Sequence, residues 1–226
     1  LFNQYFGNQG IFPIDSFSHF DTGFRVLNGE HPFKDYWIVS GPIIDYLQGL
    51  IFLFFDVSWQ TYLLNASLLN AFLSVATYKL LNNFSLRKKY SFFYTICLSI
   101  LAYPTSGTPF VDHHSTFFSI IAVYCLILGM FKEKKVYWFF LPIFVVLGFL
   151  SKQVPSTYIF LSILIVLFYH FTTNSRQKNL EIILTLAISA FLILISILIF
   201  FYLNDIKVQS FIDQYINYPR EIGSKR

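Results

Sequence analysis

Charged residues are scarce in this chain. Asp, Glu, Lys and Arg make up 12% of its 226 residues, whereas 55% are hydrophobic, 21% are aromatic, and the mean hydropathy is +0.57. Soluble domains carry about 25% charged residues. The shortage of charge therefore excludes an ordinary soluble domain and predicts an all-α protein with several membrane spans.

Cysteine is also nearly missing from the chain. Cys97 and Cys125 are the only two cysteines and lie inside apolar runs, which excludes a disulfide framework and a Cys-x-x-Cys metal pair. We expect both to behave as small buried hydrophobic residues. Since the chain begins without Met and without a charged segment before an apolar stretch, we also expect a preceding span in a longer protein.

Apolar segments alternate with short polar loops along most of the chain. A membrane-spanning helix needs roughly 20 residues. The segment 42–56 is shorter, follows Gly41 and begins with Pro42, and contains the polar residues Asp45 and Gln48, so we interpret it as an interfacial or re-entrant juxtamembrane helix. About six spans follow, over 59–83, 90–104, 113–131, 136–150, 155–171 and 180–203. The alternative is seven spans, with residues 1–41 on the opposite side of the membrane.

The positive charge predicts the orientation. The net charge of +4 lies mostly in clusters at 86–89, 132–135 and 176–178, which occupy every second loop. Such loops are typically cytoplasmic, so the clusters indicate topology and not a nucleic-acid surface. The remaining polar segments should then share the external face: a first loop over 1–57, two short loops over 105–112 and 151–155, and an external tail over 204–226.

The first loop carries acids and histidine that a protein filling a bilayer would not need. Asp15 precedes His19 by four residues, and Asp21 precedes Arg25 by four, so each pair shares a face on a helix. Asp15 could instead be an N-cap, and Asp21 with Arg25 a surface ion pair. The favoured interpretation is an active-site loop.

Other ionisable residues stand at the predicted external ends of spans. Asp112, His113 and His114 are costly there unless paired, hydrated or metal-bound. Adjacent helical histidines point about 100° apart, so one of them could bind a divalent metal ion with Asp112 while the other faces elsewhere. Lys152 lies in a loop predicted to be external, against the positive-inside pattern, and its ammonium could bind a phosphate at the membrane surface. The alternative is a snorkelling lysine that marks a helix end.

Two further groups of residues receive structural interpretations. Polar residues within spans should form interhelical hydrogen bonds: Asn65, Asn70 and His170. Aromatic residues near the predicted interface should form an aromatic belt: Tyr36, Trp37 and Trp59.

Several short motifs resemble a known family. They are Phe12-Pro-Ile-Asp15, Val26-Leu-Asn-Gly29, His31-Pro-Phe-Lys-Asp35, Ser40-Gly-Pro42 and the apolar run to Phe55-Asp-Val57. In this order they resemble the first external loop of GT-C superfamily glycosyltransferases, in the branch of protein O-mannosyltransferases and aminoarabinose transferases with RgtA/B-like domains. Lys152-Gln153 resembles a Lys-Gln step in bacterial members. The adjacent acid usual in that family is Ser16 here.

The resemblance implies a GT-C-like helical bundle and an enzyme of the bacterial inner (plasma) membrane with its active site on the external face. A polyprenyl-phosphate-linked sugar would be the donor, and a glycan, lipid or protein the acceptor. Asp15 would be the general base of an inverting transfer, and Asp112, with a histidine, would orient the acceptor or hold a divalent metal ion.

The resemblance also implies substrate-binding residues. Lys152 and Arg25 would neutralise the departing lipid phosphate, His19 and Gln153 would contact substrate, and the helix over 42–56 would border the groove for the lipid tail. The main alternative is a transporter or lipid flippase, but these more often show internal repeats, and none is evident in this sequence. A polysaccharide polymerase or ligase and a purely structural membrane protein are further alternatives.

Overall fold

The computed structural model describes residues 1–10, 17–102 and 107–224. It is 80% helical. Within the described residues there is no β-strand, only an isolated bridge between Pro32 and Tyr36. The predicted all-α membrane protein is confirmed.

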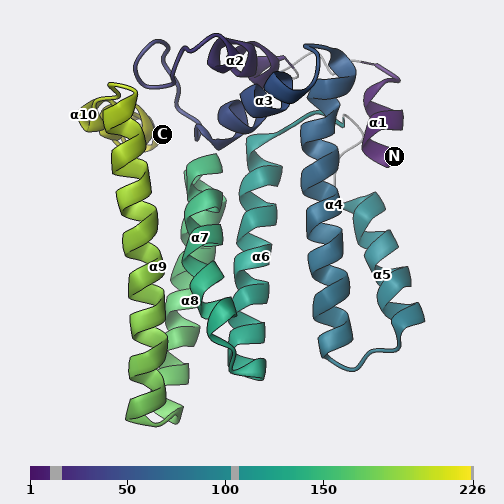
Figure 1. Cartoon of the computed structure of the whole chain (residues 1–226), viewed down its shortest axis with the longest axis vertical. Helices are drawn as coiled ribbons and strands as arrows, with labels where there is room; N and C mark the ends of the chain where they lie inside the picture. The colour runs from purple at the N-terminus through teal and green to yellow at the C-terminus, as the bar shows by residue number, and fades with distance from the viewer. Residues whose placement is uncertain (11–16, 103–106, 225–226) are drawn as a thin grey trace.

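Six helices run side by side along the long axis of the molecule (Figure 1). Their bounds fall within a few residues of the six spans expected from the sequence. They are α4 (Trp59–Asn83), α5 (Lys88–Leu101), α6 (Val111–Lys132), α7 (Lys135–Ser151), α8 (Gln153–Thr173) and α9 (Arg176–Leu203).

Three helices in the described part of the chain are long and apolar enough to cross a membrane, namely α6, α8 and α9. Helix α5 has 14 residues, which span about 21 Å at 1.5 Å per residue, against a hydrocarbon core of about 30 Å. Helix α7, with 17 residues, is also short. Since α4, α5 and α7 are not among the three helices that meet both conditions, their crossing of the membrane stays a prediction.

The two ends of the bundle differ in composition. The α4–α5, α6–α7 and α8–α9 turns, which carry the Lys/Arg clusters, lie together at one end (Figure 1). The other end is covered by α1 (Phe2–Gly7), α2 (Ser18–Leu27), α3 (Ile43–Phe54) and the segment 28–42 between them, which together we call the cap. Helix α3 lies across the ends of the bundle helices and not among them.

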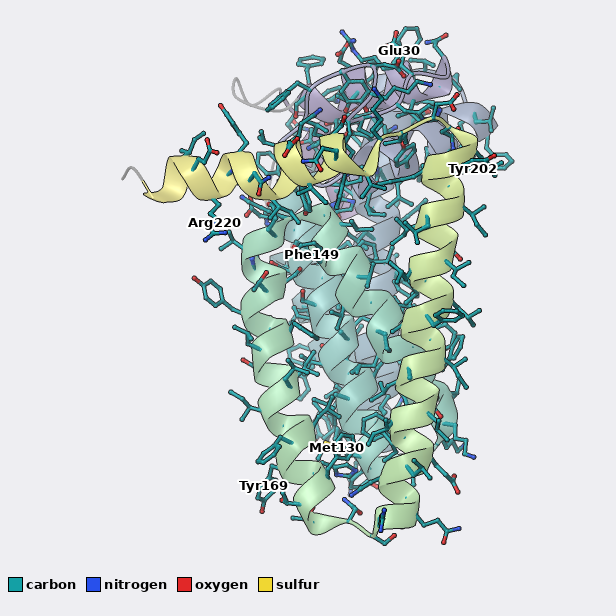
Figure 2. All side chains as sticks on the ribbon, turned by 90° about the vertical axis from the view of Figure 1, so that its left-hand side faces the viewer. Glu30, Met130, Phe149, Tyr169, Tyr202 and Arg220 are labelled. Carbon is teal, nitrogen blue, oxygen red and sulfur yellow. The ribbon has the colours of Figure 1, made fainter. Side chains whose placement is uncertain are left out.

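The C-terminal segment, expected as a tail, is helical at the capped end. It comprises α10 (Val208–Ile212), η1 (Asp213–Asn217) and α11 (Tyr218–Ser224). Figure 2 shows these helices crossing the bundle end at a steep angle to α9. Within η1, a π-helix, the successive residues Gln214 and Tyr215 are both buried. Gln214 bonds the backbone of Phe33 and Ile38, so it fastens this segment to the cap.

The apolar core gathers around α6. Phe117, Phe118 and Ile121 of that helix pack with residues of α4, α7 and α8, and Cys125 is buried among them as expected. Cys97, also expected to be buried, is only partly buried. Helix α9 has the opposite character, because its side chains are apolar on nearly every face and mostly exposed. An exposed apolar surface of this extent is typical of a helix in contact with lipid or with another membrane helix.

Small residues allow α6, α7 and α8 to approach closely below the cap. A Cβ on Gly148 would lie 2.8 Å from Ser156 Oγ and 2.9 Å from Ser119 Oγ. Ser156 Oγ hydrogen-bonds with Ser115 Oγ at 2.7 Å and with Ser119 Oγ at 3.1 Å. Small residues with hydroxyl bonds between helices are typical of membrane bundles.

Gly41 is the point where the cap rests on the bundle, and its substitution supplies the first prediction. Its N–H donates to Ser151 O at 3.0 Å, and a Cβ there would lie 1.7 Å from Leu150 O. Since backbone would have to move, Gly41→Ala should lower the free energy of unfolding by about 1–3 kcal/mol. Thermal unfolding in detergent measures this, with Gly10→Ala as control because a Cβ there meets no atom within 4 Å. Equal stability of the two variants would contradict the packing described.

Candidate active site beneath the cap

A cavity of about 440 Å³ lies between the cap and the bundle. Its walls come from α2, α3, the segment 37–40, the start of α6 and the junction between α7 and α8. The polar side chains among its lining residues belong to Ser18, His19, Thr22, Ser40, Asp45, Asp112 and Lys152. The cavity therefore brings together residues more than 130 positions apart in the sequence.

Asp112 and Lys152 meet at this cavity. Asp112 is in the first turn of α6, where the helix dipole favours an acid. Lys152 separates α7 from α8 in an extended conformation, and its Nζ donates to Asp112 Oδ1 at 2.7 Å. The side chain of Asp112 is 47% exposed and that of Lys152 is 34% exposed. The structure thus pairs two residues that charge parity alone had predicted to share one end.

Asp45 is the third charged residue of the cavity wall, and the sequence did not single it out as a site residue. It is in the first turn of α3 and is completely buried. Its Oδ1 accepts from His19 Nδ1 at 2.9 Å and from Thr22 Oγ1 at 2.6 Å, and its Oδ2 accepts from the Tyr36 hydroxyl at 3.1 Å. The sequence did contain one indication of this role: Asp45 is an acid in an otherwise apolar segment that starts directly after Gly41-Pro42.

The three aromatic residues assigned to an interfacial belt have different surroundings. Trp37 is 61% exposed, as a belt residue would be. Tyr36 instead turns its hydroxyl inward, and burial together with the carboxylate of Asp45 raises the pKa of Tyr36. Trp59 donates through Nε1 to Gly7 O at 2.9 Å, which joins α4 to α1.

The two histidines of α6 face different environments, as their helical spacing predicts. His114 is completely buried, with Nδ1 3.1 Å from Phe110 O and Nε2 2.9 Å from Asn65 Oδ1. Asn65 in turn bonds Gln48 of α3 at 3.2 Å. His113 packs its ring against those of Phe110 and Phe117.

A metal ion held by Asp112 with His113 or His114 stays a prediction. His114 is completely buried, and a protein oxygen lies within 3.1 Å of each of its ring nitrogens, so this histidine is not a ready ligand for the divalent ion that we considered. Across residues 1–10, 17–102 and 107–224, no group of three or more His, Cys, Asp or Glu residues is placed to hold a metal ion.

Arg25 and Gln153, which the resemblance assigned to substrate, contact protein groups. Arg25 donates to Asp21 at 2.9 Å and to Glu30 at 3.2 Å, and these carboxylates raise the pKa of Arg25. It does not line the cavity. The amide of Gln153 donates to Val39 O at 3.1 Å and to Tyr215 O at 2.6 Å, which ties α8 to the cap and to η1.

Other polar residues of the bundle serve packing between helices. Asn70 donates to Asn3 Oδ1 at 2.9 Å and to Ser99 O at 2.8 Å, so it joins α4 to α1 and α5 as expected. His170 lies at the opposite end of the molecule from the cavity, where its ring is next to Trp138 of α7. Its printed hydrogen bonds are with Asn174 at the end of its own helix, so the interhelical hydrogen bond expected of His170 is not among them. Asp15, the predicted general base, lies outside the described residues.

Comparison with known proteins identifies the family. The family model described as dolichyl-phosphate-mannose-protein mannosyltransferase matches residues 31–200, which is 170 of 226 residues. The chain belongs to this family. The family match confirms the predicted membrane glycosyltransferase and covers the cavity residues Asp45, Asp112 and Lys152, but it begins after Asp15 and His19. No curated protein and no solved structure matches the chain.

The two structurally described acids of the cavity should differ in their effect on stability. Asp45→Ala removes the acceptor of the buried His19 and of the half-buried Tyr36 hydroxyl, and should lower the free energy of unfolding by about 2–4 kcal/mol, since each donor left unsatisfied costs about 1–3 kcal/mol. Asp112→Ala breaks a half-exposed ion pair and should cost at most about 1 kcal/mol. Thermal unfolding of both variants in the same detergent measures the difference. Similar losses would contradict the contrast in burial.

Proposed function

We propose that this membrane glycosyltransferase transfers a sugar from a polyprenyl-phosphate donor to an acceptor hydroxyl at the capped end, with inversion at the anomeric carbon. Mannose is the first sugar to test, because the description of the family names dolichyl-phosphate-mannose. Protein is the first acceptor to test for the same reason. The capped end would face outward, at the external face of a bacterial inner (plasma) membrane.

The position of Lys152 in the chain, one helical turn before the first residues of α8 that line an apolar cavity, carries the proposal. A second cavity, of about 680 Å³, lies between α7, α8 and α9 and is lined almost entirely by apolar side chains. Ser156 and Thr157, one turn after Lys152, mark one limit of its α8 wall, and Leu167 marks the other. A lipid tail in this cavity would have its phosphate near the Lys152 ammonium. Helix α3, expected to border a lipid-tail groove, does not line this cavity.

Lys152 can stabilise the leaving phosphate. As the bond between the anomeric carbon and the phosphate oxygen breaks, its electron pair stays on that oxygen, and a fixed ammonium lowers the energy of this charge. In the structure the ammonium is bound to Asp112. A bound phosphate would share the Lys152 ammonium with Asp112. The Asp112 carboxylate would then be placed to orient the acceptor.

Asp15 completes the proposed mechanism. A carboxylate within hydrogen-bond reach of the acceptor hydroxyl can take its proton as the oxygen forms a bond with the anomeric carbon. Attack from the side opposite the phosphate inverts that carbon. The family resemblance of Phe12-Pro-Ile-Asp15 supports this role.

Transfer of labelled sugar from polyprenyl-phosphate donors, mannose included, tests the proposal with the protein in liposomes. Asp15→Asn should lower the rate by at least about 100-fold, because the base is lost. Lys152→Gln should lower it by about 100-fold, because charge on the leaving group is no longer stabilised. The control is Asp21→Asn, an exposed residue paired with Arg25. Lipid movement across the liposome membrane without any sugar transfer would instead indicate a flippase.

The orientation has a separate test. Ser18→Cys, at the exposed start of α2, should react with a membrane-impermeant thiol reagent added to intact cells. Lys134→Cys, in the exposed α6–α7 turn, should react only after the membrane is opened. Both changes are made in a Cys97→Ser background. The reverse pattern would show that the cap faces the cytoplasm.

A further inference from the structure

The proposed mechanism leaves the most buried charge of the site without a role. Asp45 is 0% exposed, and a buried carboxylate is costly unless its oxygens are hydrogen-bonded. Three side chains from two parts of the cap, α2 and Tyr36, supply those bonds. Because its oxygens are engaged by protein, Asp45 acts on a ligand only through its partners.

Of these partners, His19 is the one whose second polar atom can serve a ligand. Its Nδ1 is 2.9 Å from Asp45 Oδ1, and a carboxylate accepts, so the proton of a neutral ring lies on Nδ1. The other nitrogen, Nε2, then carries a lone pair. His19 lines the same cavity as Lys152 and Asp112. An imidazole fixed in this way can accept a hydrogen bond from a hydroxyl.

The backbone around this pair is also fixed. A Cβ on Gly23 would lie 2.5 Å from Gln48 Cγ, and one on Gly49 would lie 2.6 Å from Val26 Cγ1. In both helices these contacts follow the Asp45–His19 bond within two turns, so α2 and α3 are in close contact next to it. Such packing limits movement of the imidazole relative to the carboxylate.

We propose that Asp45 is a positioning residue that holds His19 as its Nδ1–H tautomer, so that His19 Nε2 accepts a hydrogen bond from a substrate hydroxyl in the cavity. The role assigned to the hydroxyl rests on the proposed function. The pairing of Asp45 with His19 is independent of it. Two experiments separate these parts.

Nitrogen-15 NMR of the imidazoles in the full chain, in detergent and without substrate, tests the pairing. At neutral pH His19, assigned by its loss in His19→Asn, should show a protonated Nδ1, an unprotonated Nε2 and a strongly deshielded Nδ1 proton. Asp45→Asn should move that proton upfield, because a neutral acceptor bonds less strongly than a carboxylate. Thr22→Val removes another donor to Asp45 and should leave the proton deshielded. A protonated Nε2, or no response to Asp45→Asn, would overturn the proposal.

Sugar transfer tests the use of Nε2. The amide nitrogen of His19→Asn can replace Nδ1 and keep Asp45 bonded, but the variant lacks Nε2, so its kcat/KM should fall roughly tenfold, the value of one hydrogen bond. His19→Gln places an amide oxygen near the position of Nε2 and should recover most of the loss. If His19→Asn raises only the KM for the donor, the hydroxyl bound by Nε2 belongs to the donor sugar. If it raises only the KM for the acceptor, the hydroxyl belongs to the acceptor. Equal rates in wild type and His19→Asn would overturn the role of Nε2, whereas an inactive wild type would overturn the proposed function.

Discussion

A carboxylate that is removed from water must be surrounded by hydrogen-bond donors, and at the capped end of this molecule that requirement falls on Asp45. Its donors come from α2 and from Tyr36, so satisfying one acid fixes a helix and a loop against α3. The position of α2 in turn sets one wall of the cavity. The geometry of the candidate site thus depends on a residue whose own atoms are inaccessible to substrate.

The cap is attached to the bundle at places where backbone and amide groups meet. Gly41 allows the cap to touch the end of α7, and Gln153 donates to carbonyls of both the cap and η1. Gln214 closes the arrangement from the C-terminal side. In a membrane bundle, where polar groups have few alternatives to protein partners, such amides are well suited to hold a cap in place. They account for Gln153 better than substrate binding does.

Much of the architecture could be predicted from the sequence, since it follows from local patterns. Long apolar runs predicted the helices, and lysine clusters at alternate turns placed the first loop, Asp112 and Lys152 at one end. The site was predicted less completely. Asp112 and Lys152 do meet at the cavity, but Arg25 is paired with two acids, and His114 is buried against Asn65 and Phe110. Asp45 was noted only as a polar residue in a short helix.

The sequence by itself determined the class of protein, the order of its helices and the end at which its ionisable residues gather, because hydropathy and charge act over a few neighbouring residues. The family could also be recognised from the sequence, because the order of its short motifs can be read without a structure. Only the tertiary structure decided which polar groups bond to which. Asp45 is 26 residues from His19, His114 is 49 from Asn65, and Lys152 is 40 from Asp112. A hydrogen bond depends on separations of tenths of an ångström, and those arise only when helices distant in sequence pack together.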